Sequence, residues 1–237
     1  MDEAGVANRA LQLPADSIKD GISVDFVAVP WGAALGDSYY DTMLMDMSVF
    51  EAGIKAEEEG YDAVCIDTVS DSGMYALRSR LNIPVLGPGQ AAFHVACMLG
   101  HKFSVITMWD EWFHLYKKVL TEYKLESRCA SLRSINTRPD LEELLAGKEE
   151  VIFEKLEKES LRAIQEDGAD VIVLGSTTMH QSHGFLQQAL PVPVINPGLM
   201  SYKLCEIFLE TGLTHSKTAF PAPQQPNDQF ILSRVPD

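Results

Sequence analysis

The sequence predicts an α/β fold of two pseudo-symmetric, Rossmann-like halves, each with a parallel sheet, and an active-site cleft between the halves. Two observations predict it: short apolar runs alternate with amphipathic stretches of about 10 to 20 residues, and one strand–helix–strand segment is repeated. Such runs are typical of parallel strands joined by crossover helices. We assign residues 1–92 and 197–237 to the first half and residues 93–196 to the second.

The apolar runs are predicted to be strands. Most of them are continuously apolar, as expected for strands that helices cover on both faces of a sheet. In chain order, the predicted strands are 24–30, 62–67, 83–87, 103–108, 130–135, 170–175 and 192–196.

The stretches between these runs have the apolar periodicity of helices. The first long one ends on Gly60, a residue type that commonly follows a helix. A later charged stretch has Glu and Lys four residues apart, which marks a solvated helix face. A helix-like segment, "ANRALQLPADSI", opens the chain, and a Pro-rich tail is predicted to be irregular. After the opening segment, the predicted helices in chain order are 45–60, which ends on Gly60, 74–82, 91–100, 110–125, the charged 140–167, 178–189 and 199–212.

The charge balance excludes several classes of partner. The chain has 19 Lys and Arg against 34 Asp and Glu, a formal net charge of −15, and such a surface repels nucleic acid and anionic membranes. The acidic N-terminus lacks the apolar core of a signal peptide, and no run is long enough to span a membrane. The four cysteines are scattered, and no metal-ligand or phosphate-loop spacing is present. We therefore expect a soluble, cytoplasmic, reduced homo-oligomer that binds a small-molecule substrate without a metal or other cofactor.

The internal repeat places a polar switch after a strand in each half. Residues 58–89 align with residues 166–198, so that "PVLGPG" matches "PVINPG". In this register Thr68 lies opposite Ser176. Because open α/β sheets bind ligands at the carboxyl ends of their strands, we expect the two hydroxyls to face one small molecule from opposite sides.

Several motifs around these switches resemble the aspartate/glutamate/hydantoin racemase superfamily. "LGSTT" is similar to the L-G-C-T-x segment of aspartate and glutamate racemases. "SYYD", "EEEGYDA" and "TVSDSG" resemble, in the same order, S-x-Y-D, E-x-E-G-Y-D-A and C-F-G-D-P-G of the hydantoin and allantoin racemase branch, and "GLTHSK" resembles the ending of that branch. The resemblance covers about residues 24 to 225 and implies chemistry at both switches.

Two features depart from the superfamily pattern. Members normally carry one cysteine at each switch, and here both positions are replaced, by Thr68 and by Ser176. Members also usually open with a strand before the first helix, whereas this sequence starts with a helix-like segment. Either the recorded start lies inside the gene, or the first half lacks an inner strand. A missing inner strand would leave a gap in a parallel sheet, so we expect a truncated or mis-assigned start.

The replaced thiols change the chemistry that the site can carry. A thiol starts from a pKa of about 8.5 that is readily lowered, whereas a hydroxyl is a poor base without an adjacent activator. Two-base racemisation through Thr68 and Ser176 alone is therefore not expected. In a first alternative role, the hydroxyls and the backbone N–H groups of the switches hold an enolate-like or carboxylate oxygen.

Two further roles involve neighbouring residues. Ser176 is a candidate nucleophile, assisted by His180 or His183. Asp67 or Asp71 is a candidate base, because a partly desolvated carboxylate has a raised pKa. Each role has a structural alternative, since serine is a common helix N-cap and Asp71 also fits a capping position.

The remaining candidates surround the two switches or end a neighbouring strand. Thr107 ends the predicted strand 103–108, whose carboxyl end should face the same cleft. Thr68 and Ser176 are the catalytic pair in this interpretation. The candidate substrate-binding residues are Asp67, Val69, Ser70, Asp71, Thr107, Gly175, Thr177, Thr178 and His180.

The sequence thus predicts a cofactor-independent enzyme that acts at the α-carbon of a small carboxylate, ureido or hydantoin-like compound. Racemisation is the activity that the resemblance implies, but the absent thiols favour isomerase, lyase or hydrolase chemistry over a two-thiol racemase. One alternative is a Ser176-dependent hydrolase of a small amide or cyclic substrate. Another is a non-catalytic small-molecule binding protein.

Overall fold

The computed structural model describes residues 3–138 and 149–232 of the chain. The chain divides into two compact units. The first unit consists of Met1–Ile66, Ser72–Gly87 and Tyr202–Asp237, and the second of Asp67–Asp71 and Pro88–Ser201. Thr68 and Ser176, which we expected in different halves, therefore belong to the same unit.

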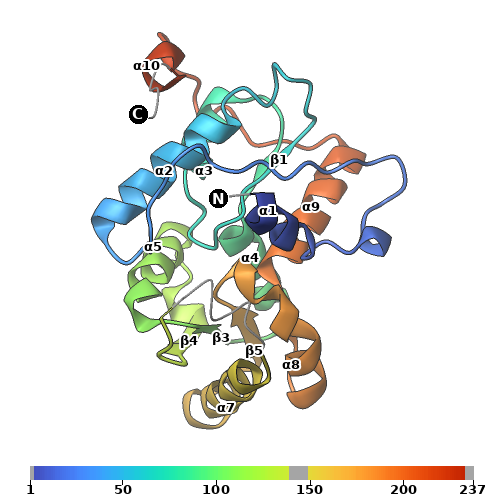
Figure 1. Cartoon of the computed structure of the whole chain (residues 1–237), viewed down its shortest axis with the longest axis vertical. Coiled ribbons are helices and arrows are strands. Elements are labelled where there is room, and N and C mark those ends of the chain that lie inside the picture. Colours follow the sequence, from blue (N-terminus) through green and yellow to red (C-terminus); the bar gives the residue numbers. More distant parts are fainter. Residues whose placement is uncertain (1–2, 139–148, 233–237) are drawn as a thin grey trace. The chain divides into compact units, whose positions relative to one another are not determined.

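The second unit is built on a four-stranded parallel sheet (Figure 1). Its strands are β3 (Phe103–Thr107), β4 (Cys129–Ser134), β5 (Val171–Leu174) and β6 (Val194–Ile195). They lie in the order β4-β3-β5-β6, and every neighbouring pair is parallel. All residues of β3 and β5 are buried, which explains why these two strands are almost continuously apolar. The predicted α/β fold with parallel sheets is confirmed.

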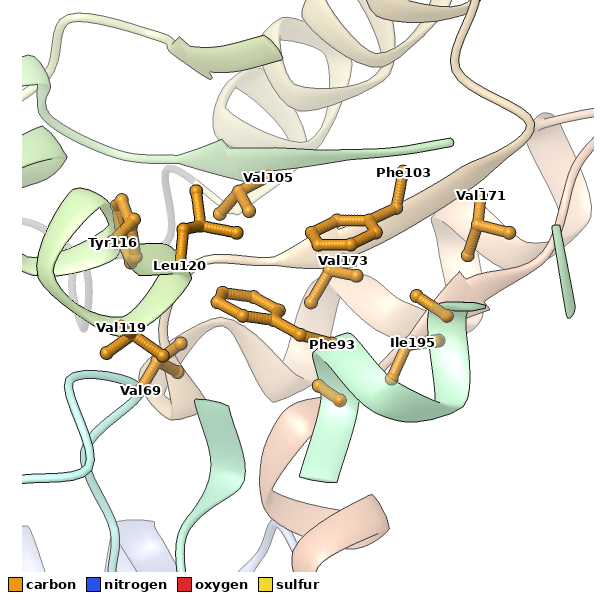
Figure 2. Packing of buried hydrophobic residues seen from close by; sticks show 12 residues of the cluster. Val69, Phe93, Phe103, Val105, Tyr116, Val119, Leu120, Val171, Val173 and Ile195 are labelled. Atoms are coloured by element: carbon orange, nitrogen blue, oxygen red, sulfur yellow. The ribbon is translucent and has the colours of Figure 1, made fainter. Parts of the chain in front are cut away.

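Two apolar clusters join this sheet to its helices. The apolar side chains on one face of β3 and β5 pack in the first cluster, and those on the opposite face pack in the second. This is expected because successive side chains of a strand point to opposite faces of the sheet. The first cluster contains side chains of α4 (Pro88–Leu99) and α5 (Phe113–Tyr123) (Figure 2). In it Phe93 stacks on Phe103, with ring centroids 5.1 Å apart. The second cluster contains side chains of α7 (Glu149–Asp167) and α8 (His183–Ala189).

Helix α5 forms because apolar side chains recur every three or four residues along it. Leu115, Tyr116, Val119 and Leu120 are all buried, and the last three pack in the cluster that contains side chains of β3 and β5. The helix ends at Lys124, which has a left-handed backbone with φ 57° and returns its N–H to the carbonyl of Leu120. The helix begins at Phe113, after a short 3-10 helix over Asp110–Trp112. Both elements lie inside the predicted helical range 110–125.

The first unit contains a two-stranded parallel sheet and several helices. Ser38 is the N-cap of α2 (Tyr39–Gly53), and its hydroxyl oxygen accepts the N–H of Asp41 at 3.1 Å. Gly73 has φ 68°, and a Cβ there would lie 2.7 Å from the carbonyl oxygen of Asp46, so this close approach of two helices requires glycine. The elements are α1 (Glu3–Ala10), α2 (Tyr39–Gly53), β1 (Val64–Cys65), α3 (Met74–Arg80), β2 (Val85–Leu86), α10 (Asp228–Leu232) and α9 (Pro197–Thr211), which begins in the second unit.

The strand predicted at 24–30 is wrong. This stretch forms neither a helix nor a strand. A strand needs a hydrogen-bonded partner, and among the described residues of the first unit the paired strands are β1 and β2.

The helix predicted at 45–60 is misplaced at both ends. It begins at Tyr39 and ends at Gly53, and the residues from there to Gly60 form turns. Three consecutive glutamates, 57–59, would crowd like charges at the negative end of the helix dipole, which disfavours its continuation.

Three other observations concern the helices. The predicted helical residues 140–148 lie outside the described residues, and α7 begins at Glu149. The tail, predicted to be irregular, contains the short helix α10. Within residues 3–138 and 149–232, no helix has the length and apolar character needed to cross a membrane.

Candidate functional site

The first switch, residues 67–71, follows β1 in the sequence and forms a tight turn. The N–H of Asp71 donates to the carbonyl of Thr68 at 2.9 Å. Asp71 has φ 51°, a left-handed conformation that aspartate adopts more readily than most residues. Thr68 is half-buried within this turn.

The carboxylate of Asp71 holds the first switch in place. It accepts the N–H of Gly89 at 2.8 Å and that of Gln90 at 2.7 Å, and thereby caps the start of α4. It also accepts the hydroxyl of Tyr123 at 2.7 Å. Asp71 is 5% exposed. Three donors on a carboxylate favour its charged form and weaken it as a base, so the capping alternative fits Asp71, although the helix it caps is not the one that follows it.

Two other candidates in the first switch are buried. The side chain of Val69 packs in the first apolar cluster next to Val119, as Figure 2 shows. Ser70 is 2% exposed. The accessible part of this switch is therefore centred on Asp67 and Thr68, which are both half-buried.

The second switch, residues 175–178, begins where β5 ends. Tyr116 donates its hydroxyl to the carbonyl of Gly175 at 2.7 Å, and the hydroxyl of Thr107 lies 2.7 Å from the same phenol oxygen. A phenol has one proton to donate, so Thr107 is the donor to Tyr116. A Cβ on Gly175 would lie 2.7 Å from both the Thr107 Cβ and the Tyr116 oxygen, so this position requires glycine.

This network changes the interpretation of Thr107. It was expected to face the ligand, but it is 0% exposed and its hydroxyl is committed to Tyr116. Tyr116 was not among the predicted site residues. Burial raises its pKa well above the usual value, so the phenol remains a proton donor.

Ser176 is the N-cap of the short 3-10 helix Thr177–Ser182. Its oxygen accepts the N–H of Thr178 at 3.2 Å and lies 2.7 Å from the Thr178 hydroxyl. Ser176 and Thr178 are half-buried, whereas Thr177 is 1% exposed. The capping interpretation of Ser176 is therefore correct as local structure, and it leaves part of this residue accessible.

A hydrogen bond connects the two switches. The Thr177 hydroxyl donates to the carbonyl of Asp67 at 3.1 Å. Asp67 directly precedes Thr68, and Thr177 directly follows Ser176. This contact places the two switches side by side within the second unit. That the Thr68 and Ser176 hydroxyls face one ligand stays a prediction.

The two histidines near Ser176 contact backbone carbonyls. The Nδ1 of His180 lies 3.1 Å from the carbonyl of Thr177, and the Nε2 of His183 lies 3.1 Å from the carbonyl of Val194. The helix predicted at 178–189 is divided into the 3-10 helix and α8 at this point. Both imidazoles therefore have a structural role in holding the second switch and β6.

The cysteines form no disulfide, and two of them contact each other. All four cysteines are free. In the first unit the thiol of Cys65 hydrogen-bonds to Cys205, which lowers the pKa of the Cys205 thiol although burial opposes the shift. Sequence reasoning missed this pair. In the described part of the chain, no group of three or more His, Cys, Asp or Glu could hold a metal ion.

Comparison with known proteins assigns the chain to a family. Residues 7–205 match the family described as Asp/Glu/Hydantoin racemase. The chain belongs to this family. It is 32% identical over 191 residues to a hydantoin racemase of Pseudomonas sp. (strain NS671), which is 81% of this chain and 76% of that protein.

Two solved structures of allantoin racemases have the same fold. The one from Klebsiella pneumoniae is 26% identical, with a TM-score of 0.86, and the match covers 95% of this chain and 91% of that chain. The one from Pseudomonas fluorescens is also 26% identical, with a TM-score of 0.86 and 94% of each chain covered. The chain is thus an enzyme of the racemase superfamily on its hydantoin and allantoin branch.

Proposed function

We propose that the protein catalyses cofactor-independent proton exchange at the α-carbon of a hydantoin-like or ureido compound, and that Thr68 and Ser176 bind the reacting substrate. The observation that carries this proposal is the hydrogen bond from Thr177 to the carbonyl of Asp67 at 3.1 Å. It supports the proposal because Asp67 and Thr177 are the neighbours in sequence of Thr68 and Ser176, the positions that the resemblance assigns to the reacting groups.

The substrate class follows from the relatives and from the chemistry of the switches. The similar proteins are hydantoin and allantoin racemases. A hydantoin ring carries two carbonyl oxygens and two N–H groups close to its α-carbon. Hydroxyl groups both donate and accept hydrogen bonds, so Thr68 and Ser176 suit a ring of this kind.

Ser176 acts in this proposal as a hydrogen-bond donor to a developing enolate oxygen. Its oxygen already accepts the N–H of Thr178, and the Thr178 hydroxyl lies 2.7 Å away as a second donor. When Thr178 donates, the Ser176 proton is available to the substrate, and each donor in such a chain strengthens the next. Donors fixed before the reaction stabilise the charge that forms in the transition state.

Asp67 is the proposed base. A serine or threonine hydroxyl is a poor base without an activator, and Asp71 is held by three donors. Asp67 is half-buried and directly precedes Thr68. In this scheme Asp67 removes the α-proton, and a proton from Asp67 or from water returns to the carbon.

The test is proton exchange measured by NMR in deuterated water. Hydantoins substituted at the α-carbon, allantoin, N-carbamoyl amino acids and arylmalonates are each incubated with the protein. We expect deuterium at the α-carbon of a hydantoin or ureido compound with no other bond broken. Ring opening would identify a hydrolase and loss of carbon dioxide a lyase, and binding without exchange would identify a binding protein; each of these results contradicts the proposal.

A double substitution tests the pairing of the two positions. Changing Thr68→Cys together with Ser176→Cys should add inversion at the α-carbon on a compound that the native protein binds. The reason is that a thiol reaches a useful thiolate fraction near its pKa of about 8.5, whereas a hydroxyl does not. Chiral chromatography measures inversion, and each single variant is the control, since one thiol serves one face of the carbon. Equal inversion by a single variant would contradict the paired placement.

A further inference from the structure

We propose that Tyr116 and Tyr123, both on α5, are positioning residues that fix the two switches, one hydroxyl to each. This inference rests on the proposed function for its effect on catalysis, but its structural part does not. Neither tyrosine was expected from the motifs, and neither belongs to a switch. The two side chains act through Gly175 and Asp71.

The spacing of the two tyrosines places them on one face of the helix. Seven residues are close to two turns of an α-helix, at 3.6 residues per turn, so Tyr116 and Tyr123 project in nearly the same direction. Both rings pack against the first apolar cluster, in which Tyr116 is 2% exposed and Tyr123 half-buried. A single helix of the second unit therefore presents both hydroxyls on one face.

Tyr116 fixes the peptide group that leads into Ser176. Its hydroxyl donates to the carbonyl of Gly175 at 2.7 Å and accepts from Thr107 at the end of β3. The carbonyl of Gly175 and the N–H of Ser176 share one planar peptide unit. Holding that plane sets the direction in which the Ser176 side chain leaves the backbone.

Tyr123 fixes the turn that contains Thr68. Its hydroxyl donates to the Asp71 carboxylate at 2.7 Å, and that same carboxylate oxygen accepts the N–H of Gln90 at 2.7 Å. Asp71 has φ 51°, a conformation that needs support from its surroundings. The Asp71 N–H closes the turn onto the Thr68 carbonyl, so the phenol acts on Thr68 through Asp71.

The apolar residues between the two tyrosines strengthen this arrangement. Val119 lies between them on α5 and packs next to Val69 of the first switch (Figure 2). Val119 is 0% exposed and Val69 is 4% exposed. The helix therefore meets the first switch through an apolar contact and a hydrogen bond, and the second switch through a hydrogen bond.

The experiment compares Tyr116→Phe and Tyr123→Phe with Phe103→Leu. The last change removes packing at the start of β3, at the opposite end of that strand from Thr107, and leaves both phenols in place. All proteins are assayed for α-proton exchange well below their melting temperatures. We expect Tyr116→Phe and Tyr123→Phe each to lower kcat roughly ten- to hundredfold with KM nearly unchanged. The reason is that a small displacement of a reacting group lowers the rate by a factor of this size. Phe103→Leu should keep kcat within about twofold, since it lowers stability without moving a hydroxyl.

The pH profile separates positioning from proton transfer. Because burial keeps the pKa of Tyr116 well above its usual value, the phenol does not titrate in the assay range. The pH dependence of kcat in Tyr116→Phe should therefore have the same shape as in the native protein. Loss of one limb of the profile would make Tyr116 an acid or base and overturn the positioning role, as would a kcat loss no larger than that of Phe103→Leu.

Hydrogen–deuterium exchange followed by mass spectrometry tests the structural part without turnover. We expect Tyr116→Phe to speed amide exchange in residues 175–178 and Tyr123→Phe to speed it in residues 67–71, with neither effect in Phe103→Leu. Unchanged exchange in both segments overturns the inference even if the enzyme is active. If the native protein exchanges no substrate proton, the proposed function fails, and the amide exchange pattern still decides whether the tyrosines fix the switches.

Discussion

The two switches follow parallel strands in the sequence, yet they are held by different chemistry. The first is anchored by a charged group, since the Asp71 carboxylate accepts two backbone N–H groups and the Tyr123 hydroxyl. The second is anchored by neutral groups, Tyr116 and Thr107, around the carbonyl of Gly175. Hydrogen bonds to an ionised acceptor are roughly twice as strong as neutral ones. We infer that the first switch is the more rigid and the second the more easily displaced.

The largest expected effect is the loss of the charged anchor. Asp71→Ala leaves two backbone donors and a phenol without their acceptor at a site that is 5% exposed. Leaving buried donors unpaired costs about 1–3 kcal/mol each, and part of this is recovered by water, so we expect unfolding free energy to fall by about 4 kcal/mol. Urea denaturation measures the change.

The control for this prediction is the neutral anchor. Tyr116→Phe removes two neutral hydrogen bonds, one to Gly175 and one from Thr107, and should cost about 1 to 3 kcal/mol. If Asp71→Ala were no more destabilising than Tyr116→Phe, the charge of Asp71 would not distinguish the two switches.

The next largest effect concerns the reaction. Ser176→Ala removes the proposed donor to the enolate oxygen and should lower kcat on the order of a hundredfold, as the loss of an oxyanion donor typically does. The matched control is Ser182→Ala. Ser182 is 1% exposed and donates to the carbonyl of Met179 at 2.8 Å within the same 3-10 helix, away from the switch.

Stability must be separated from catalysis in this pair. Loss of the Ser176 cap costs about 1 kcal/mol of stability in addition to the effect on the rate, so both variants are assayed at a temperature at which they remain folded. Native turnover in Ser176→Ala would mean that this serine is a helix cap and nothing more.

The sequence was sufficient for the centre of the sheet in the second unit, because β3 and β5 are wholly buried and their sequences are almost continuously apolar. The predicted strand 103–108 is one residue longer than β3 at its carboxyl end, and the predicted strand 170–175 is one residue longer than β5 at each end. Residues 24–30 show the limit of this reasoning. Their composition suits a strand, but whether a segment becomes one depends on a partner that composition does not show.

The sequence indicated two candidate switches but not the contacts that hold them. The repeat and the motifs led to Thr68 and Ser176, whereas the anchors come from other elements. Tyr123 reaches Asp71 across 52 residues of sequence, and Tyr116 reaches Gly175 across 59. One signal was present: two tyrosines seven residues apart in a predicted helix must share a face. What they bind there is decided by tertiary packing.

The smallest expected effect concerns the hydrogen bond between the switches. Thr177→Val keeps the shape of a side chain that is 1% exposed and removes its donation to the carbonyl of Asp67. A single neutral hydrogen bond contributes about 1 kcal/mol to folding. If the same loss appears in the transition state for α-proton exchange, kcat falls by roughly fivefold, since 1.4 kcal/mol corresponds to a factor of ten.

Ser160→Ala is the matched control for this last change. Ser160 is also fully buried and donates its hydroxyl to a backbone carbonyl, that of Leu156 at 2.7 Å, but it lies in α7 rather than at a switch. Both variants should lose similar unfolding free energy in urea, whereas Thr177→Val alone should lose exchange rate. The difference between the two rates isolates what the contact between the switches contributes to the reaction, because each variant loses one hydroxyl that donates to a backbone carbonyl. Equal rates in the two variants would show that the switches work independently, and the hydrogen bond that carries the proposed function would then be structural.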